Sequence, residues 1–150
     1  MPSIRLATLQ DIPALTGLLA HLFAQEAEFQ PDTEAQQRGL QQIIEDPKTG
    51  EILVTEEKDR ITGMVNLLYT ISTALGAPVA LLEDMVVDPA SRNSGTGSAL
   101  LQAAISHARQ QGCQRITLLT DTDNLAARRF YGRHGFAASA MCPLRLSLQA

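Results

Sequence analysis

The segment Arg92–Gly97 has the residue types and the spacing of an anion-binding turn. It reads Arg-Asn-Ser-Gly-Thr-Gly, follows an apolar run that ends in Met85–Val87, and precedes an amphipathic helical pattern. The first N–H groups of a helix have no acceptor within the helix, and the helix dipole adds partial positive charge there. Gly95 and Gly97 let the backbone approach a ligand closely, and the arginine contributes a cation. We therefore predict a pyrophosphate site at this turn.

Two better-known phosphate-binding loops do not fit this segment. A Walker A loop needs Gly-Lys-Ser/Thr, whereas Gly97 is followed by Ser98 and Ala99. The Rossmann fingerprint Gly-x-Gly-x-x-Gly needs a third glycine, and Leu100 occupies that position. The turn therefore belongs to another class of phosphate-binding protein.

The length and charge of the chain narrow its class further. Its 150 residues predict a single domain over 1–150 with a substantial core. A net charge of −4 argues against nucleic-acid binding. The N-terminal residues 1–6 contain no long apolar region of the signal-peptide type, and no apolar run is long enough to span a membrane. We therefore expect a cytoplasmic protein with no membrane partner.

The histidines and cysteines do not have the spacing of metal ligands, so we predict no metal site. The residues concerned are His21, His107, His134, Cys113 and Cys142.

Hydrophobic periodicity predicts an α+β fold with a mixed, mostly antiparallel sheet. The expected strands cover residues 3–7, 51–55, 61–70, 79–87, 116–119 and 144–148. The expected helices cover residues 12–24, with Asp11 as the N-cap, and residues 33–45, 98–111 and 124–133. A strand, a helix and a further strand over residues 79–119 predict one parallel, right-handed β-α-β crossover.

With this order of elements, the chain resembles the GNAT superfamily of acetyl-CoA-dependent N-acetyltransferases. The family pattern is an apolar strand, Val-x-Pro, Arg-x-x-Gly-x-Gly/Ala, a helix, Asn-x-x-Ala-x-x-x-Tyr and Gly-Phe. This chain has Val87-Asp88-Pro89, the turn 92–97, Asn124 to Tyr131 and Gly135-Phe136. Asn93 stands where the family often has glycine, at a variable position.

The resemblance implies a bound acetyl-CoA as co-substrate. Its pyrophosphate would contact the turn, and its pantetheine arm would pair with the backbone of an unpaired strand edge. Asn124, Arg128 and Tyr131 share one helix face that would look toward the co-substrate. The implied binding residues are Met85, Val86, Val87, Arg92, Asn93, Ser94, Gly95, Thr96, Gly97, Ser98, Asn124, Arg128 and Tyr131.

Two residues are candidates for proton transfer. Tyr131 is the candidate acid for the departing thiolate, although a tyrosine is a weaker acid than a thiol and could serve by hydrogen bonding alone. Glu83 is the candidate base, acting through a water, because the Glu83-Asp84 pair resembles that of polyamine acetyltransferases. Strand alternation sends the two carboxylates to opposite faces unless a bulge intervenes, so periodicity does not decide between them.

The acceptor is expected to be a small, cationic, polyamine-like primary amine. In the family the first two helices and their connection shape the acceptor pocket, and this stretch is acidic and aromatic. Its residues are Phe23, Glu26, Glu28, Phe29, Asp32 and Glu34. The alternatives are acetylation of a protein N-terminus or lysine, transfer of a longer acyl group, and a non-catalytic acyl-CoA-binding regulatory module. Dimers are frequent in the family, so the resemblance allows a homodimer.

Overall fold

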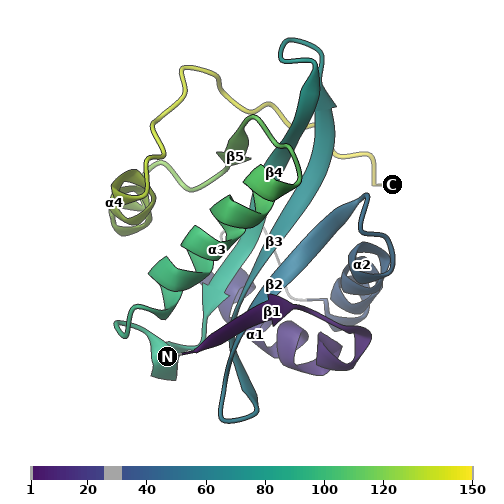
Figure 1. The fold of residues 1–150 in the computed structure, drawn as a ribbon, viewed down its shortest axis with the longest axis vertical. Coiled ribbons are helices and arrows are strands. Elements are labelled where there is room, and N and C mark those ends of the chain that lie inside the picture. Colours follow the sequence, from purple (N-terminus) through teal and green to yellow (C-terminus); the bar gives the residue numbers. More distant parts are fainter. Residues whose placement is uncertain (1, 26–31, 150) are drawn as a thin grey trace. The chain divides into compact units, whose positions relative to one another are not determined.

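The computed structural model describes residues 2–25 and 32–149, and Figure 1 shows the order of their helices and strands. The chain forms two compact units, residues 1–119 and 120–150. The first unit contains β1 (Ser3–Leu6), α1 (Ile12–Gln25), α2 (Thr33–Glu45), β2 (Gly50–Glu57), β3 (Arg60–Ser72), β4 (Ala77–Val87), α3 (Thr96–Gln110) and β5 (Ile116–Leu118). The second contains α4 (Leu125–Arg133). The single domain expected from the length stays a prediction.

The first unit is built on one five-stranded sheet of order β1-β2-β3-β4-β5. Neighbouring strands run antiparallel except β4 and β5, which pair in parallel from Ala80↔Ile116 to Leu82↔Leu118. The helix α3 connects these two parallel strands. The predicted mixed, mostly antiparallel sheet with one β-α-β crossover is therefore confirmed.

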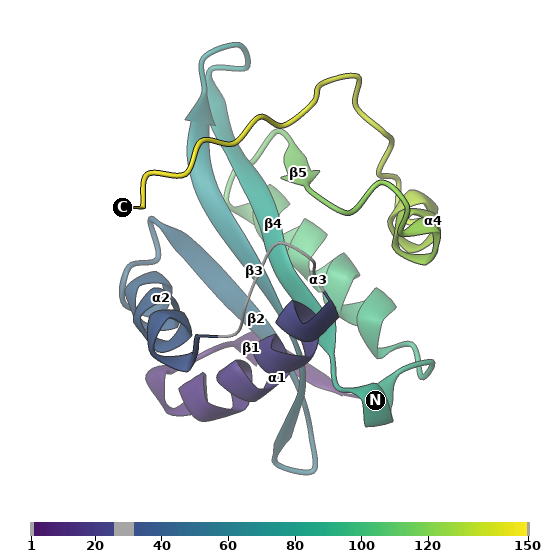
Figure 2. The ribbon, with the colours of Figure 1, turned by 180° about the vertical axis from the view of Figure 1, so that it is seen from behind.

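Helices cover both faces of this sheet, with α3 on one face and α1 and α2 on the other (Figures 1 and 2). The apolar face predicted for α3 is buried, because Leu100, Leu101, Ala104 and Ala108 are all at most 1% exposed. Beneath α1 and α2 lies a second buried cluster. Its members are Leu15, Leu18, Leu19, Leu40, Ile52, Val54, Met64 and Val86.

Local signals account for several element boundaries. Asp32 caps α2, with its carboxylate accepting a hydrogen bond from the Ala35 N–H at 3.1 Å. Gly112 follows α3 at φ 85°, a left-handed conformation that ends a helix. The first helix begins at Ile12, directly after the residue predicted as its N-cap, Asp11, and it follows a 3-10 turn over Leu9–Asp11.

The predicted last strand over residues 144–148 is wrong. The second unit contains α4, and its described residues after that helix form no strand. Leu144, Leu146 and Leu148 are 82–95% exposed. Alternation of apolar residues is typical of a strand, but a strand also needs a neighbour for its backbone hydrogen bonds. Residues 120–149 provide no such neighbour within their unit.

No helix in the described part of the chain is both long enough and apolar enough to cross a membrane.

Candidate active site

The predicted anion-binding turn joins the end of β4 to the start of α3. Asn93 and Gly95 adopt left-handed conformations, with φ values of 65° and 83°. A Cβ atom placed on Gly95 would meet no atom within 4 Å. The glycine is therefore needed for its backbone conformation, because there is room for a larger side chain but the left-handed φ disfavours one.

Side chains of the turn brace its backbone. The Ser94 hydroxyl donates to the Ser91 carbonyl at 2.6 Å and shares a hydrogen bond of 2.9 Å with the hydroxyl of buried Thr96. The Arg92 Nε atom donates to the Val87 carbonyl at 3.2 Å, which ties the turn to the end of β4. These contacts hold the turn in one shape before any ligand arrives.

The backbone of this turn fits a pyrophosphate. The first α-helical hydrogen bond of α3 runs from the Ala99 N–H to the Gly95 carbonyl at 3.0 Å. The N–H groups of Thr96 and Gly97 therefore precede the first acceptor within the helix, and they are the groups that bind anions at helix starts. Exposed Arg92 adds positive charge beside them. Asn93, Ser94 and Ser98 complete the segment predicted from the sequence.

The edge of β4 next to this turn loses its neighbour. Parallel pairing with β5 ends at Leu82↔Leu118, whereas β4 continues to Val87. Met85–Val87 therefore lie beyond the last ladder pair on this side of the strand, while they remain adjacent to β3 on the other side. An unpaired strand edge is where an extended, amide-bearing molecule can add its own hydrogen bonds.

A β-bulge occurs in β4 at this same place. Asn66 of β3 pairs with Glu83, and Met64 pairs with Val86, so one residue of β3 faces two residues of β4. The first of those two residues, Asp84, has a φ of 53°. This left-handed conformation is uncommon for a residue with a side chain, although aspartate tolerates it better than most.

The bulge brings both carboxylates to one face of the sheet. Asn66 lies opposite Ile52, and Ile52 belongs to the core beneath α1 and α2, so Asn66 and Glu83 share that face. Asp84 accepts a hydrogen bond from the Asn66 side chain, so its carboxylate reaches the same face. The alternation that would have separated Glu83 and Asp84 is interrupted, and the negative charges lie together.

The two carboxylates differ in environment. Glu83 is exposed, whereas Asp84 is half-buried. Burial, and then the negative charge of Glu83, raise the pKa of Asp84 to about 6, while the hydrogen bond from Asn66 opposes this shift. Sequence reasoning missed Asn66, although an asparagine inside the apolar run Met64–Leu68 is the signal that identifies it.

The remaining predicted site residues lie in the second unit, on α4. Asn124 caps this helix, accepting from the Ala127 N–H at 3.1 Å, and an Arg128 Nη1 atom donates to the Thr122 carbonyl at 3.0 Å. The Tyr131 ring contacts those of Phe130 and Phe136, with centroid distances of 5.2 and 5.7 Å. Burial raises the pKa of Tyr131.

The predicted acidic acceptor rim is described in part. Glu26, Glu28 and Phe29 lie outside the described residues. Asp32 and Glu34 are exposed at the start of α2, where Asp32 serves as the helix cap. The rim therefore stays a prediction.

A polar cluster that the sequence did not predict lies on the α3 side of the sheet. The Tyr69 hydroxyl donates to Glu51 Oε1 at 3.0 Å, and His107 Nε2 lies 2.8 Å from the same oxygen. The three side chains come from β3, β2 and α3, up to 56 positions apart, so no local motif reveals them. Among the described residues, no group of three or more metal-ligating side chains occurs.

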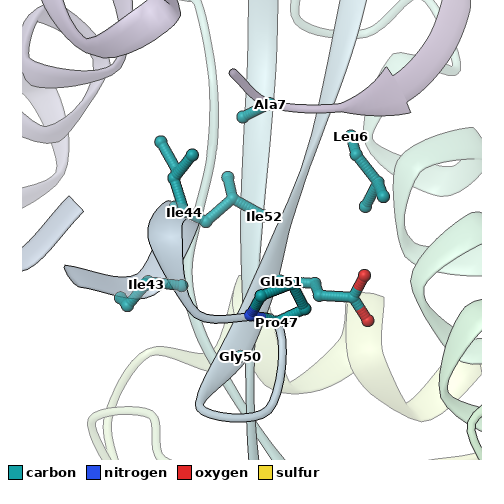
Figure 3. A pocket seen from close by; sticks show the side chains of 8 residues that line it. All are labelled: Leu6, Ala7, Ile43, Ile44, Pro47, Gly50, Glu51 and Ile52. Carbon is teal, nitrogen blue, oxygen red and sulfur yellow. The ribbon is translucent and has the colours of Figure 1, made fainter. Parts of the chain in front are cut away.

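A small crevice lies elsewhere, between β1, β2 and the end of α2 (Figure 3). Its lining is mostly apolar, and Figure 3 shows the Glu51 carboxylate turned away from Ile44 and Ile52. None of the residues predicted for catalysis or co-substrate binding lines it.

Comparison with known families gives a match over most of the chain. The sequence model described as the acetyltransferase (GNAT) family matches residues 17–136. The matched range includes β4, the anion-binding turn, α3 and α4.

Individual proteins show the same relationship. The uncharacterized N-acetyltransferase YhfO of Bacillus subtilis (strain 168) is 32% identical over 137 residues, which are 89% of either chain. Glucosamine 6-phosphate N-acetyltransferase of Trypanosoma brucei brucei is 35% identical over 80 residues, or 53% of this chain and 52% of that one. A crystal structure of a transcriptional regulator from Bacillus halodurans C-125 aligns with a TM-score of 0.83 and 28% identity, covering 99% of this chain and 100% of the other.

Proposed function

Because this chain belongs to the acetyltransferase (GNAT) family and is an acetyl-CoA-dependent N-acetyltransferase, we propose that its acceptor is a small, cationic primary amine. The observation that carries the proposal is the carboxylate pair of Glu83 and Asp84, which the bulge turns to one face of β4. Paired negative charges attract a protonated amine and oppose anionic acceptors. A relative named for the amino-sugar phosphate glucosamine 6-phosphate supports a small molecule as the acceptor, while the positive charge of the acceptor is inferred from the carboxylate pair alone.

The donor site of this proposal consists of the turn and the adjacent edge of β4. Arg92, Asn93 and the amides from Ser94 to Ser98 would hold the pyrophosphate of acetyl-CoA. The backbone of Met85–Val87 would pair with the pantetheine arm, and a Val86 or Val87 N–H would donate to the thioester oxygen as charge develops there. The family resemblance also assigns Asn124 and Arg128 to co-substrate binding.

The chemistry requires one proton to leave the ammonium group before attack. A carboxylate of the Glu83–Asp84 pair takes it, Glu83 being the base that the family resemblance favours. The freed nitrogen attacks the thioester carbon, its C–N bond forms, and the C–S bond breaks. The second nitrogen proton leaves as the thiolate gains one, so one proton is released to solvent for each turnover.

Tyr131 is the residue proposed to stabilise the departing thiolate through a hydrogen bond. Burial raises its pKa, which makes it a poor proton donor and a good neutral hydrogen-bond donor at pH 7. We expect Tyr131→Phe to lower kcat by about 10²-fold, within the range of a lost acid–base group. Calorimetric Kd values for acetyl-CoA should stay within about threefold, because the ring is retained. An unchanged kcat would remove Tyr131 from the reaction.

The acceptor class is tested with a panel of amines and a free-thiol release assay. The panel contains polyamines, amino sugars and their phosphates, peptides with free N-termini, and lysine-containing peptides. We expect the highest kcat/KM for a polycationic small amine, with mass spectrometry detecting a gain of one acetyl group. A preference for peptides would assign a protein acceptor, and acetyl-CoA binding without thiol release would indicate a non-catalytic module.

A further inference from the structure

We propose that the Asp84 carboxylate, held on the β3–β4 bulge by Asn66, is the group that takes the proton from the acceptor amine. This inference rests on the proposed function and divides the work of the carboxylate pair. Asp84 is the proton acceptor, Asn66 positions it, and exposed Glu83 supplies the negative charge that attracts the amine.

The backbone conformation at Asp84 is the first observation behind this assignment. Its φ of 53° and the register shift between β3 and β4 turn the carboxylate out of the normal alternation of the strand. Left-handed conformations at residues other than glycine persist where the surrounding structure holds them, and they gather at functional sites. Here the bulge lies just after Leu82, where the pairing with β5 ends.

Asn66 provides the second, independent observation. The residue is 2% exposed, and its side chain hydrogen-bonds to Asp84, which fixes the amide with its nitrogen toward the carboxylate. Its Oδ1 atom is buried and has no hydrogen-bond partner among the described residues. A buried carbonyl oxygen without a donor is unfavourable, so placing this amide beside Asp84 costs stability, which points to a role in holding the carboxylate.

The raised pKa of Asp84 suits a group that accepts a proton and later releases it. With a pKa raised to about 6, Asp84 is ionised at pH 7 yet remains basic enough to accept a proton and release it. Glu83 on its own strand and Asn66 on β3 are the side chains that act on it.

Charged groups on the other elements next to β4 are engaged elsewhere. On α1, exposed His21 acts on Asp88, to which Arg60 of β3 is paired. On α3, His107 binds Glu51 across the opposite face of the sheet. No charged residue lies in β5, Ile116–Leu118.

Proton transfer from the amine to Asp84 moves one proton and leaves the electron pair on nitrogen. The ammonium N–H bond breaks, the proton forms an O–H bond with Asp84, and the nitrogen keeps the electron pair with which it attacks the thioester carbon. Asp84 returns its proton to solvent after the acetylated product leaves.

Three variants test the assignment through the pH dependence of kcat/KM, measured with the best amine of the panel. In the wild type we expect activity to fall below an apparent pKa near 6. Asp84→Asn should lower kcat by at least about 10²-fold and abolish this acidic limb. Glu83→Gln is the matched control, because it removes the neighbouring negative charge. It should keep the acidic limb but move it to lower pH, since the Glu83 charge that raises the pKa of Asp84 is gone. Asn66→Leu should keep the limb, moved to higher pH because a hydrogen bond that lowers the pKa is gone.

Acetyl-CoA affinity and far-UV circular dichroism serve as folding controls, and both should match the wild type in all three variants. An Asp84→Asn enzyme that keeps its activity and its acidic limb would overturn the assignment while leaving the proposed function intact. Loss of the limb in Glu83→Gln would transfer the role to Glu83. A wild type that releases no thiol with any amine would overturn the proposed function itself, and this inference with it.

Discussion

Two clusters, each built around a carboxylate, lie on opposite faces of the same sheet. They differ in how many hydrogen-bond donors the carboxylate has. On the α3 side, Glu51 is matched by the Tyr69 hydroxyl at 3.0 Å and by His107 Nε2 at 2.8 Å. On the side of α1 and α2, Asp84 has one neutral partner, Asn66, and a like charge at Glu83 as its neighbour. The Glu51 carboxylate therefore has two donors, whereas the Asp84 carboxylate has one donor and a neighbouring negative charge that repels it.

This difference indicates that the Glu51 carboxylate contributes to stability, whereas the Asp84 carboxylate contributes to function. A satisfied polar network ties together the strands and helices that contribute to it, here β2, β3 and α3. A carboxylate with too few donors, beside a buried carbonyl oxygen with none, lowers stability, and a local cost of this kind is typical of functional sites. The first cluster should therefore respond to mutation in stability, and the second in activity.

The largest stability effect is expected at Glu51. Glu51→Ala removes the shared acceptor of Tyr69 and His107 and should lower the free energy of unfolding by about 3 kcal/mol. For a domain of this size the melting temperature should fall by roughly 6–12 °C. Glu51→Gln, which keeps an acceptor oxygen, should lose less.

Both Glu51 variants should retain the acidic limb of the pH–rate profile, since neither touches the opposite face of the sheet. Calorimetric melting of the wild type and the two variants, together with their pH profiles, checks this. A large change in the pH profile with little change in stability would contradict the contrast between the clusters.

At Asp84 we expect a mutation to raise the free energy of unfolding, whereas the mutations of Glu51 lower it. Because its folded pKa of about 6 lies above the usual value of 3.8, the native state holds this proton more tightly than the unfolded state does. The stability penalty is absent well below pH 3.8, grows as the pH rises, and is complete above pH 6. Asp84→Asn should therefore raise the free energy of unfolding at pH 7 by about 2 kcal/mol.

Urea unfolding of Asp84→Asn at pH 4 and pH 7 measures this effect, and the gain should be much smaller at pH 4. Glu83→Gln, an exposed neighbour, serves as the control with little expected change. A loss of stability at pH 7 would show that ionised Asp84 is structural and would remove the contrast with Glu51.

Most of the fold was predictable because hydrophobic periodicity marks the faces of helices and strands. The crossover from β4 through α3 to β5 followed from one apolar strand, a glycine turn and the next apolar strand. The prediction of a strand over residues 144–148 was wrong because an alternating pattern identifies the apolar face of a possible strand but not a neighbouring strand with which it could pair.

The parts of the site formed by one continuous segment were predictable from the sequence. The parts that depend on how separate strands and helices pair were not. The turn over residues 92–97 is continuous in sequence, so its left-handed glycine and helix start follow from the residues themselves. The face of Asp84 depends on a register shift between β3 and β4, and its partner Asn66 lies 18 positions earlier. The cluster of Glu51, Tyr69 and His107 likewise forms only when three separate elements meet.

The smallest effect of this series is expected at Tyr69. Tyr69→Phe removes one donor to Glu51, but His107 remains, so the loss at pH 7 should be about 1 kcal/mol. Burial and the bond to Glu51 raise the pKa of Tyr69 above its usual value of 10, so the stability from its neutral hydroxyl is fully present below pH 10 and declines as the pH rises beyond it. Urea unfolding at pH 7 and above pH 10 should therefore show the wild-type advantage shrinking with pH. An advantage that persists or grows in alkali would mean that Tyr69 stabilises the sheet through its ring, and that the satisfied cluster owes less to hydrogen bonding than its geometry indicates.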